Sequence, residues 1–255
     1  MAGVLDSVND FFVRLKGGTE YLSYGRPILA GWAAEQVRGL PQGTVPRVLD
    51  LGCGQGADLE LLAQTVDRKC ELLGLEGYAP YREICASKGI ETFAINVERD
   101  PLPFPDASLD VVLMNQVLEH TKDIFFIFSE VSRVLKPDGA FLLGVPNLAA
   151  WHERLLLLLG RQPSGMKVLG PHVRGFTPEG FRKFAECDGY FRLDGFRGSA
   201  FYPFPAGLSR VLARLFPGLA TAVFFRLRRT DKAGLFVEVL RSRRFETDYY
   251  TGPIP

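Results

Sequence analysis

Apolar runs and amphipathic stretches take turns along the chain between residues 47 and 147. Short runs of aliphatic residues predict buried strands, and longer stretches with apolar residues three or four positions apart predict helices. Regular alternation of strand and helix is typical of a parallel sheet with helices on both faces. The predicted strands are 47–51, 71–75, 90–95, 109–114 and 140–145, and the predicted helices are 57–65, 78–87 and 124–135.

The second half of the chain has a less regular pattern. It predicts a short apolar helix at 151–159, and a helix at 177–186 with a threonine cap followed by proline in its first turn. Two further apolar runs, 190–196 and 234–240, predict the last strands. The whole pattern therefore predicts an α/β protein with a doubly wound, mostly parallel, seven-stranded sheet.

Two flanking segments have helical patterns of their own. Residues 5–36 predict two helices that form an N-terminal arm. Residues 207–229 begin with apolar residues on one helical face beside arginines, and continue with an apolar run too short to span a bilayer. We interpret 207–229 either as a helix pair that covers the sheet or contacts a second copy, or as a basic amphipathic surface that lies on a membrane.

The composition argues against several classes of protein. A net charge of +1 gives no overall basic field, so a nucleic acid is not expected as a partner, although arginines gather late in the chain. The four cysteines have no metal-ligand spacing, and the first residues lack the basic-then-apolar pattern of a signal peptide. We expect a cytoplasmic protein without a metal, with a peripheral position at the inner face of the membrane left open by 207–229.

The stretch Val48 to Gly56 (VLDLGCGQG) joins a buried strand to a tight glycine turn. Gly52, Gly54 and Gly56 let the backbone turn and approach a ligand without interference from side chains. Dinucleotide-binding proteins have a similar turn, followed about twenty residues later by an acidic residue, and Glu76 stands at that position here. The pattern alone therefore leaves a dinucleotide and other nucleoside ligands open.

Asp50 distinguishes between these ligands by its charge. It stands two residues before the first glycine, near the place where a dinucleotide brings its pyrophosphate. Two like charges about 4 Å apart repel by roughly 4 kcal/mol at an effective dielectric constant near 20, so a pyrophosphate fits poorly. S-adenosylmethionine carries an ammonium and a sulfonium, which Asp50 attracts, and Glu76 suits its ribose hydroxyls. The alternative for Asp50 is a carboxylate that caps the following helix.

The glycine turn and three later segments resemble the class I S-adenosylmethionine-dependent methyltransferases. The resemblance implies a Rossmann-like fold, S-adenosyl-L-methionine as methyl donor and S-adenosyl-L-homocysteine as product. Within the family the chain is most similar to the small-molecule and cell-envelope branch, which includes quinone-biosynthesis and glycan-cluster methyltransferases. The later segments are Asn96 followed by LPFPDASLDVVLMNQVLEH (Leu102 to His120), EVSRVLKPDGAFLLGVPN (Glu130 to Asn147) and PHVRGFTPEGFRKF (Pro171 to Phe184).

The resemblance also suggests roles for residues. His120 takes the position that faces the transferred methyl group, and an imidazole with an ordinary pKa near 6.5 suits a general base. His120 could instead cap local backbone or line the pocket without proton transfer. Tyr24 in the arm, and His172 and Arg174 in the variable segment, are candidates for binding the acceptor. The cofactor-binding candidates are Asp50, Gly52, Cys53 through its backbone, Gly54, Glu76, Gly77, Asn96 on the adenine, Val97 and Asn115.

We therefore expect a methyltransferase that acts on a small-molecule, glycan or lipid-linked acceptor by O- or C-methylation, as a monomer or homodimer. The alternatives are an RNA methyltransferase that uses Arg226, Arg228 and Arg229, a catalytically silent S-adenosylmethionine-binding scaffold, and a nicotinamide dehydrogenase.

The length of 255 residues, nearly half of them apolar, suits one domain with a full core. We predict that this single domain, 1–255, has a helical arm (1–45), a cofactor-binding core (46–147) and two insertions that shape or cover the acceptor pocket (148–176 and 200–230).

Overall fold

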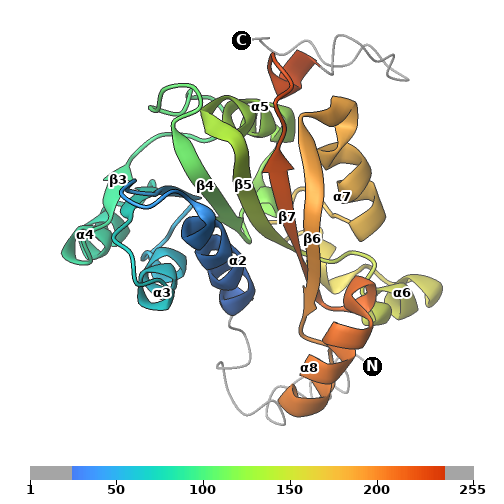
Figure 1. Ribbon diagram of the computed structural model, residues 1–255. Coiled ribbons are helices and arrows are strands. Elements are labelled where there is room, and N and C mark those ends of the chain that lie inside the picture. The colour runs from blue at the N-terminus through green and yellow to red at the C-terminus, as the bar shows by residue number, and fades with distance from the viewer. Residues whose placement is uncertain (1–24, 239–255) are drawn as a thin grey trace.

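The computed structural model describes residues 25–238, and residues 1–24 and 239–255 lie outside the described part. A seven-stranded sheet runs in the order β3-β2-β1-β4-β5-β7-β6 (Figure 1). The pairs of β7 with β5 and β6 are antiparallel, and the other pairs are parallel, which confirms the predicted mostly parallel sheet. The strands are β1 (Arg47–Leu51), β2 (Glu71–Leu75), β3 (Glu91–Phe93), β4 (Leu109–Asn115), β5 (Leu135–Pro146), β6 (Phe191–Ser199) and β7 (Ala222–Arg229).

The helices follow the predicted alternation through β5. None of the helices in 25–238 is long and apolar enough to span a membrane. The α-helices are α2 (Arg26–Gly39), α3 (Ala57–Thr65), α4 (Ala79–Ser87), α5 (Ile124–Val134), α6 (Trp151–Leu158), α7 (Pro178–Ala185) and α8 (Ala206–Leu215). The short 3-10 helices are η2 (Leu118–His120), η3 (Ser164–Met166), η4 (Cys187–Gly189), η5 (Pro217–Leu219) and η6 (Phe236–Glu238).

Side chains alternate across the sheet and divide the core into two layers. Val48, Val111 and Leu142 pack under α2 and α3 on one face, whereas neighbouring strand residues such as Leu49 and Val112 pack under α5 and α7 on the other. Both faces of the sheet are therefore buried, which explains why its strands are nearly continuous apolar runs.

The order of strands reverses between β1 and β4, because β2 and β3 extend the sheet to one side and β5 extends it to the other. In open sheets of this kind, ligands bind at the carboxyl ends of the strands beside this switch point. The turn after β1 and the end of β4 therefore mark the expected site.

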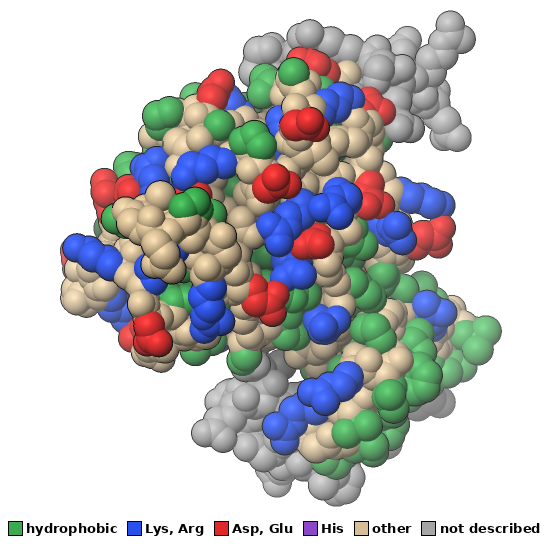
Figure 2. All heavy atoms as spheres, viewed as in Figure 1, with side chains coloured by type: hydrophobic (Ala, Val, Ile, Leu, Met, Phe, Trp, Pro, Cys, Tyr) green, Lys and Arg blue, Asp and Glu red, His purple; other side chains and the backbone are tan. Residues whose placement is uncertain are grey.

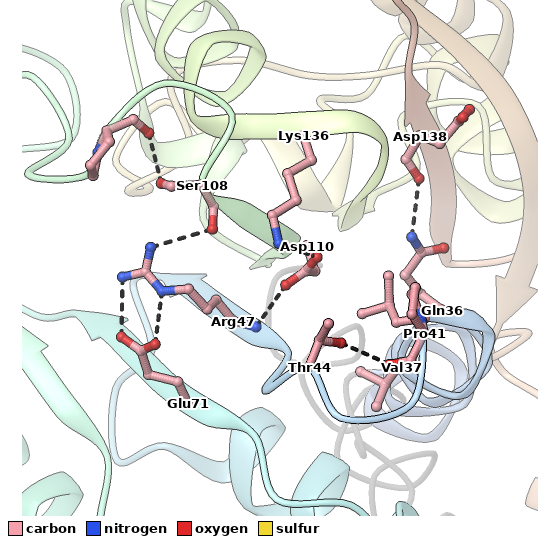
Figure 3. Close-up of polar contacts among 12 residues, drawn as sticks. Gln36, Val37, Pro41, Thr44, Arg47, Glu71, Ser108, Asp110, Lys136 and Asp138 are labelled. Carbon is pink, nitrogen blue, oxygen red and sulfur yellow. Dashed lines mark hydrogen bonds and ion pairs between the residues drawn. The ribbon is translucent and has the colours of Figure 1, made fainter.

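The opposite edge of the sheet holds a polar network that involves no part of that site (Figure 3). Arg47 donates to Glu71 through two nitrogens at 2.8 and 3.1 Å, which joins β1 to β2. Asp110 accepts from the Arg47 backbone at 2.9 Å and from Lys136 at 2.7 Å, which joins β1, β4 and β5. These contacts hold the amino ends of the central strands in register.

The end of the chain corrects two predictions. Residues 222–229, predicted as part of a helix pair or covering insertion, form β7 between β5 and β6. Phe224 packs on one face of the sheet and Phe225 on the other, which an extended strand buried on both faces allows. Only the first part of the 207–229 segment is helical, as α8.

The predicted last strand, 234–240, was also wrong over its described residues. Gly234 has a φ of 92°, which turns the backbone, and residues 236–238 form η6. The Phe236 ring packs at a tilt against Phe128 of α5, with the two ring centres 5.2 Å apart. Residues 239 and 240 lie outside the described part.

Candidate functional site

The glycine turn between β1 and α3 has a left-handed backbone. Gly52, Gly54 and Gly56 have φ angles of 77°, 54° and 78°, which favour glycine. A Cβ on Gly52 would lie 2.8 Å from Val117, and a Cβ on Gly56 would lie 2.5 Å from Ile90. A Cβ on Gly54 would meet no atom within 4 Å. Two of the glycines therefore serve close packing, and Gly54 leaves open space for a ligand to approach the backbone.

Asp50 ends up buried beneath this turn, with 2% of its surface exposed. Its Oδ2 has no hydrogen-bond partner among the described residues, and no side chain caps the start of α3, so the capping alternative is wrong. Burial raises the pKa of Asp50 well above its usual range, and the nearby Asp58 carboxylate raises it further, whereas Arg26 lowers it. A buried carboxylate without a partner is costly, so a cationic ligand group would stabilise it.

Asp58 and Arg26 belong to this site, although sequence analysis did not select either of them. Asp58 lies in the first turn of α3, 3.7 Å from the Arg26 guanidinium, and accepts from the Asn115 amide at 3.3 Å. Its place just after the glycine turn could have revealed it, because the first turn of that helix faces the carboxyl edge of the sheet. Arg26, at the start of α2, gives no local signal of its contact with α3.

Glu76 and Gly77 follow β2, next to the glycine turn. Glu76 Oε1 accepts from the backbone of Tyr78 at 2.7 Å, which fixes the carboxylate. A Cβ on Gly77 would meet nothing within 4 Å, so the backbone beside Glu76 is also open. A fixed carboxylate beside open backbone has the geometry needed to accept hydrogen bonds from ribose hydroxyls.

The remaining cofactor candidates lie around the same edge. Asn96 follows β3, and its side-chain oxygen accepts from the Glu98 backbone at 2.9 Å. Val97 packs against the core. The Cys53 side chain points into the protein, because a Cβ on Gly74 would lie 2.4 Å from its sulfur, and burial raises the pKa of this thiol. Cys53 can therefore reach a ligand only through its backbone.

S-adenosylmethionine fits the residues that the structure brings together. The Asp58 and Glu76 carboxylates both act on the buried Asp50, and Arg26 pairs with Asp58, so the region around Asp50 favours a cationic guest. Both open glycines, 54 and 77, lie in the same edge. A pyrophosphate would add negative charge to a region that already has an excess of it.

A second polar group lies beyond β4, where η2 meets the segment after η3. The rings of His120 and His172 lie edge to face with centres 4.8 Å apart, although sequence analysis treated them separately. Glu119, which sequence analysis did not select, is 2% exposed, and burial raises its pKa to about 7. The Arg174 guanidinium donates to the Lys122 carbonyl at 2.9 Å.

A cavity of about 120 Å³ lies beside this group. His172 and Arg174 line it from one side, and Glu153 on α6 lines it from another. His152 lies 3.2 Å from Glu153 and does not join the His120 group. Tyr24, the third candidate for acceptor binding, lies outside the described residues. The other residues that line the cavity are Pro146, Asn147, Leu148, Ser164, Gly165, Met166, Gly175 and Thr221.

Comparison with known proteins agrees with the site. Residues 49–143 match a family model described as a methyltransferase domain. A probable S-adenosylmethionine-dependent methyltransferase of Mycolicibacterium smegmatis is 36% identical over 104 residues, which are 39% of this chain and 38% of that protein. The demethylmenaquinone methyltransferase of Lactococcus lactis is 32% identical over 113 residues, which are 42% of this chain and 45% of that protein. The chain thus matches less than half the length of either relative.

The fold is also similar to that of a solved structure. The methyltransferase in a complex with the Trm112 activator of Haloferax volcanii has a TM-score of 0.57 and 16% identity, and the match covers 90% of this chain and 98% of that one. Together, the matched core, the sheet order and the open glycine turn make residues 49–143 similar to a methyltransferase domain, and the relative from Mycolicibacterium smegmatis is described as S-adenosylmethionine-dependent.

Proposed function

We propose that this protein transfers a methyl group from S-adenosylmethionine to a hydroxyl or an activated carbon of a small-molecule, glycan or lipid-linked acceptor. The observation that carries the proposal is the buried Asp50, whose Oδ2 has no hydrogen-bond partner among the described residues, beneath an open glycine turn. Asp50 holds the amino-acid end of the methyl donor, and Glu76 holds its ribose. The bound donor supplies an activated methyl group, and the protein's task is to align the acceptor with it.

The cavity beside His172 and Arg174 suits the acceptor. It lies at the carboxyl end of β5, the same edge of the sheet as the glycine turn. Its lining combines an imidazole, a guanidinium and the Glu153 carboxylate with apolar residues, which favours an oxygen-rich acceptor that also has an apolar part. Of the relatives compared, the demethylmenaquinone methyltransferase has a name that refers to an acceptor of this mixed kind.

His120 is the candidate base for such an acceptor. Its Nδ1 lies 3.3 Å from the Pro171 carbonyl, which leaves Nε2 free to take a proton from a hydroxyl or an acidic carbon. Replacement of His120 by alanine should leave the affinity for S-adenosylmethionine unchanged and slow methyl transfer by a factor of about 100 or more.

Calorimetric titration with S-adenosylmethionine, S-adenosylhomocysteine and NAD tests the site itself. Binding of the first two without NAD supports the proposal, and transfer of a labelled methyl group to a panel of quinones, glycans and lipids then identifies the acceptor. Binding of NAD, or of none of the three, would refute it. A protein that binds S-adenosylmethionine and methylates nothing in the panel would favour the silent scaffold.

The structure argues against the RNA methyltransferase alternative, because the three arginines that it needs are paired or buried. Arg226 pairs with Glu35 and Asp194, and Arg228 pairs with the same Asp194 at 2.9 Å. Arg229 is buried and donates to the Ser132 carbonyl at 2.7 Å. Arginines that are paired within the sheet are poorly placed to bind phosphates.

We infer a membrane contact from an apolar surface around α6 and α8. Among the described residues, 8 of the 14 exposed large hydrophobic side chains lie on these two helices or directly after them. Figure 2 shows hydrophobic side chains gathered over these two helices, with basic side chains beside them. The surface consists of Leu155, Leu157, Leu158, Leu159, Leu208, Val211, Leu215 and Phe216.

Apolar side chains beside basic ones are typical of proteins that lie on an anionic bilayer. The exposed Arg210 and Arg214 lie on the same helix, α8, as Leu208 and Leu215. The surface borders the acceptor cavity through α6, which would let a lipid-linked acceptor enter from the membrane. Sedimentation with vesicles of phosphatidylglycerol tests the contact, and a protein that stays in solution at low salt would refute it.

A further inference from the structure

Glu119, His120 and His172 bring three potential metal ligands together beyond the glycine turn. One ligand atom from each residue lies within 4.8 Å of the other two. Glu119 and His120 belong to η2, and His172 follows η3. The backbone amides of Val173 and Arg174 donate to the Glu119 carbonyl at 2.9 and 3.3 Å, so the two segments are joined by hydrogen bonds.

Backbone carbonyls fix which nitrogen of each histidine carries the proton. His120 Nδ1 lies 3.3 Å from the Pro171 carbonyl, and His172 Nδ1 lies 2.6 Å from the Gly165 carbonyl. A carbonyl only accepts hydrogen bonds, so Nδ1 is the protonated nitrogen of each neutral ring and Nε2 keeps its lone pair. Histidines that bind metals commonly donate from their second nitrogen to a carbonyl in this way.

The Glu119 carboxylate lacks a donor on one side. Its side chain is buried, and Oε2 has no hydrogen-bond partner among the described residues. His120 Nε2 lies 4.0 Å from Oε1. One potential ligand atom from each of the three residues thus lies close to the other two, and a cation between them would satisfy the buried carboxylate.

We propose that Glu119, His120 and His172 bind a divalent transition-metal cation, such as Zn²⁺, in a two-histidine, one-carboxylate site. Such sites leave a coordination position open for substrate or water. Ligand atoms around tetrahedral zinc lie roughly 3.3 Å apart, given bonds of about 2.0 to 2.1 Å. The His120 side chain is 40% exposed and has room to move the short distance that closes the site.

Sequence spacing could not reveal this site, because its ligands come from two separate segments. The absence of metal-ligand spacing led to the expectation of no metal, and the proposal replaces that expectation.

The role of the cation rests on the proposed methyl transfer, whereas its binding does not. A cation with an open position next to the cavity would bind an acceptor oxygen and lower the pKa of a hydroxyl there. His120 would then be a ligand of the cation through Nε2 and would not act as the general base. The cation would activate the acceptor in its place.

Titration of chelator-treated, dialysed protein with Zn²⁺ tests the site directly. We expect one equivalent to bind by calorimetry and by metal analysis after equilibrium dialysis. Glu119→Gln, His120→Gln and His172→Gln should each weaken Zn²⁺ binding by more than the roughly 10- to 100-fold that loss of an outer-shell partner costs. His152→Gln is the matched control, because this histidine pairs with Glu153 outside the group, and its Zn²⁺ affinity should equal that of the wild type.

Wild-type protein that binds no Zn²⁺ would overturn the proposal, as would equal affinity in wild type and all three ligand variants. Titration with S-adenosylmethionine shows that each variant is folded at the glycine turn. Zn²⁺ binding without S-adenosylmethionine binding would support the cation site and refute the proposed function. Substitution by asparagine replaces any variant that fails to fold.

Discussion

The most informative single residue is Asp50, a buried carboxylate whose Oδ2 has no hydrogen-bond partner within residues 25–238. Its position could be predicted from spacing, because a strand, a glycine turn and an acidic residue occur in order along the chain. Its burial and its missing hydrogen bond could not, because they depend on Asp58, Arg26 and the covering helices. A sequence can therefore identify the residue, and only the structure shows why a cation is favoured there.

Asp50→Asn should weaken S-adenosylmethionine binding by at least about 1.5 kcal/mol, because it keeps the shape and removes a charge-assisted interaction. Calorimetry measures the change in Kd. Asp67→Asn, at an exposed aspartate after α3, is the matched control and should bind as the wild type does. Equal affinity of the Asp50 variant and the wild type would contradict the assignment.

Glu153 gives the protein a specific dependence on pH. Burial alone would raise its pKa, but hydrogen bonds from His152 and Ser164 outweigh burial and lower the pKa to about 2. Because the pKa is lowered in the folded state, ionised Glu153 stabilises that state at pH values above the ordinary pKa of 4.5. This stabilisation is lost as the pH falls from 4.5 to about 2.

We therefore expect the unfolding free energy of the wild type to exceed that of Glu153→Gln by up to about 3 kcal/mol near neutral pH. The difference should shrink steadily below about pH 4.5. Urea unfolding at a series of pH values measures it, and a difference that stays constant down to about pH 3 would count against the role of this carboxylate.

At the scale of elements, the first half of the chain was predictable because the local sequence pattern of each element agrees with the structure that it forms. β1, β2 and α3 have the predicted bounds, and the Thr177 cap of α7 accepts from the Gly180 amide at 3.1 Å as expected. β7 was missed because its apolar start was assigned to the preceding helical stripe, although Pro217 and Gly218 mark a turn between α8 and β7. Its second half alternates, with Phe225 and Leu227 in the core and arginines between them, and this period of two was the available signal.

The glycine turn and α2 offer a matched pair of substitutions. Gly56→Ala should lower the unfolding free energy by about 1 to 3 kcal/mol, because φ is 78° and the new Cβ would lie 2.5 Å from Ile90. Gly31→Ala should raise it by about 0.5 to 1 kcal/mol, since this helical glycine has no atom within 4 Å of the added Cβ. Thermal or urea unfolding measures both, and a shift of the same sign in the two variants would be inconsistent with the turn geometry.

At the scale of the whole molecule, the donor edge, the cavity and the apolar surface belong to the same end. α6 follows β5 directly, and α8 lies in the connection from β6 to β7, whose start pairs with the end of β5. Trp151 of α6 and Leu212 of α8 share a small core, so the two helices form one body (Figure 1). The proposed membrane contact would therefore place the acceptor cavity near the bilayer.

Removal of apolar side chains from α8 should release the protein from anionic vesicles. Leu208→Ser with Leu215→Ser should reduce the bound fraction several-fold, because about half of each side chain or more is exposed and available to insert. Val45→Ser, at an exposed apolar residue before β1, is the control and should bind vesicles as the wild type does. Undiminished sedimentation of the α8 variant would place the contact elsewhere.

The position of β7 has a consequence for folding of the protein during its synthesis on the ribosome. β6 is made before β7, yet among the described strands β7 is its only neighbour in the sheet, and β5 keeps an open edge until β7 arrives. An unpaired strand and an open edge are ready partners for other chains. A nascent chain that pauses before residue 222 can therefore form a sheet of five paired strands in which the edge of β5 is exposed. The pairing of β7 with β5 must then outcompete association with neighbouring nascent chains.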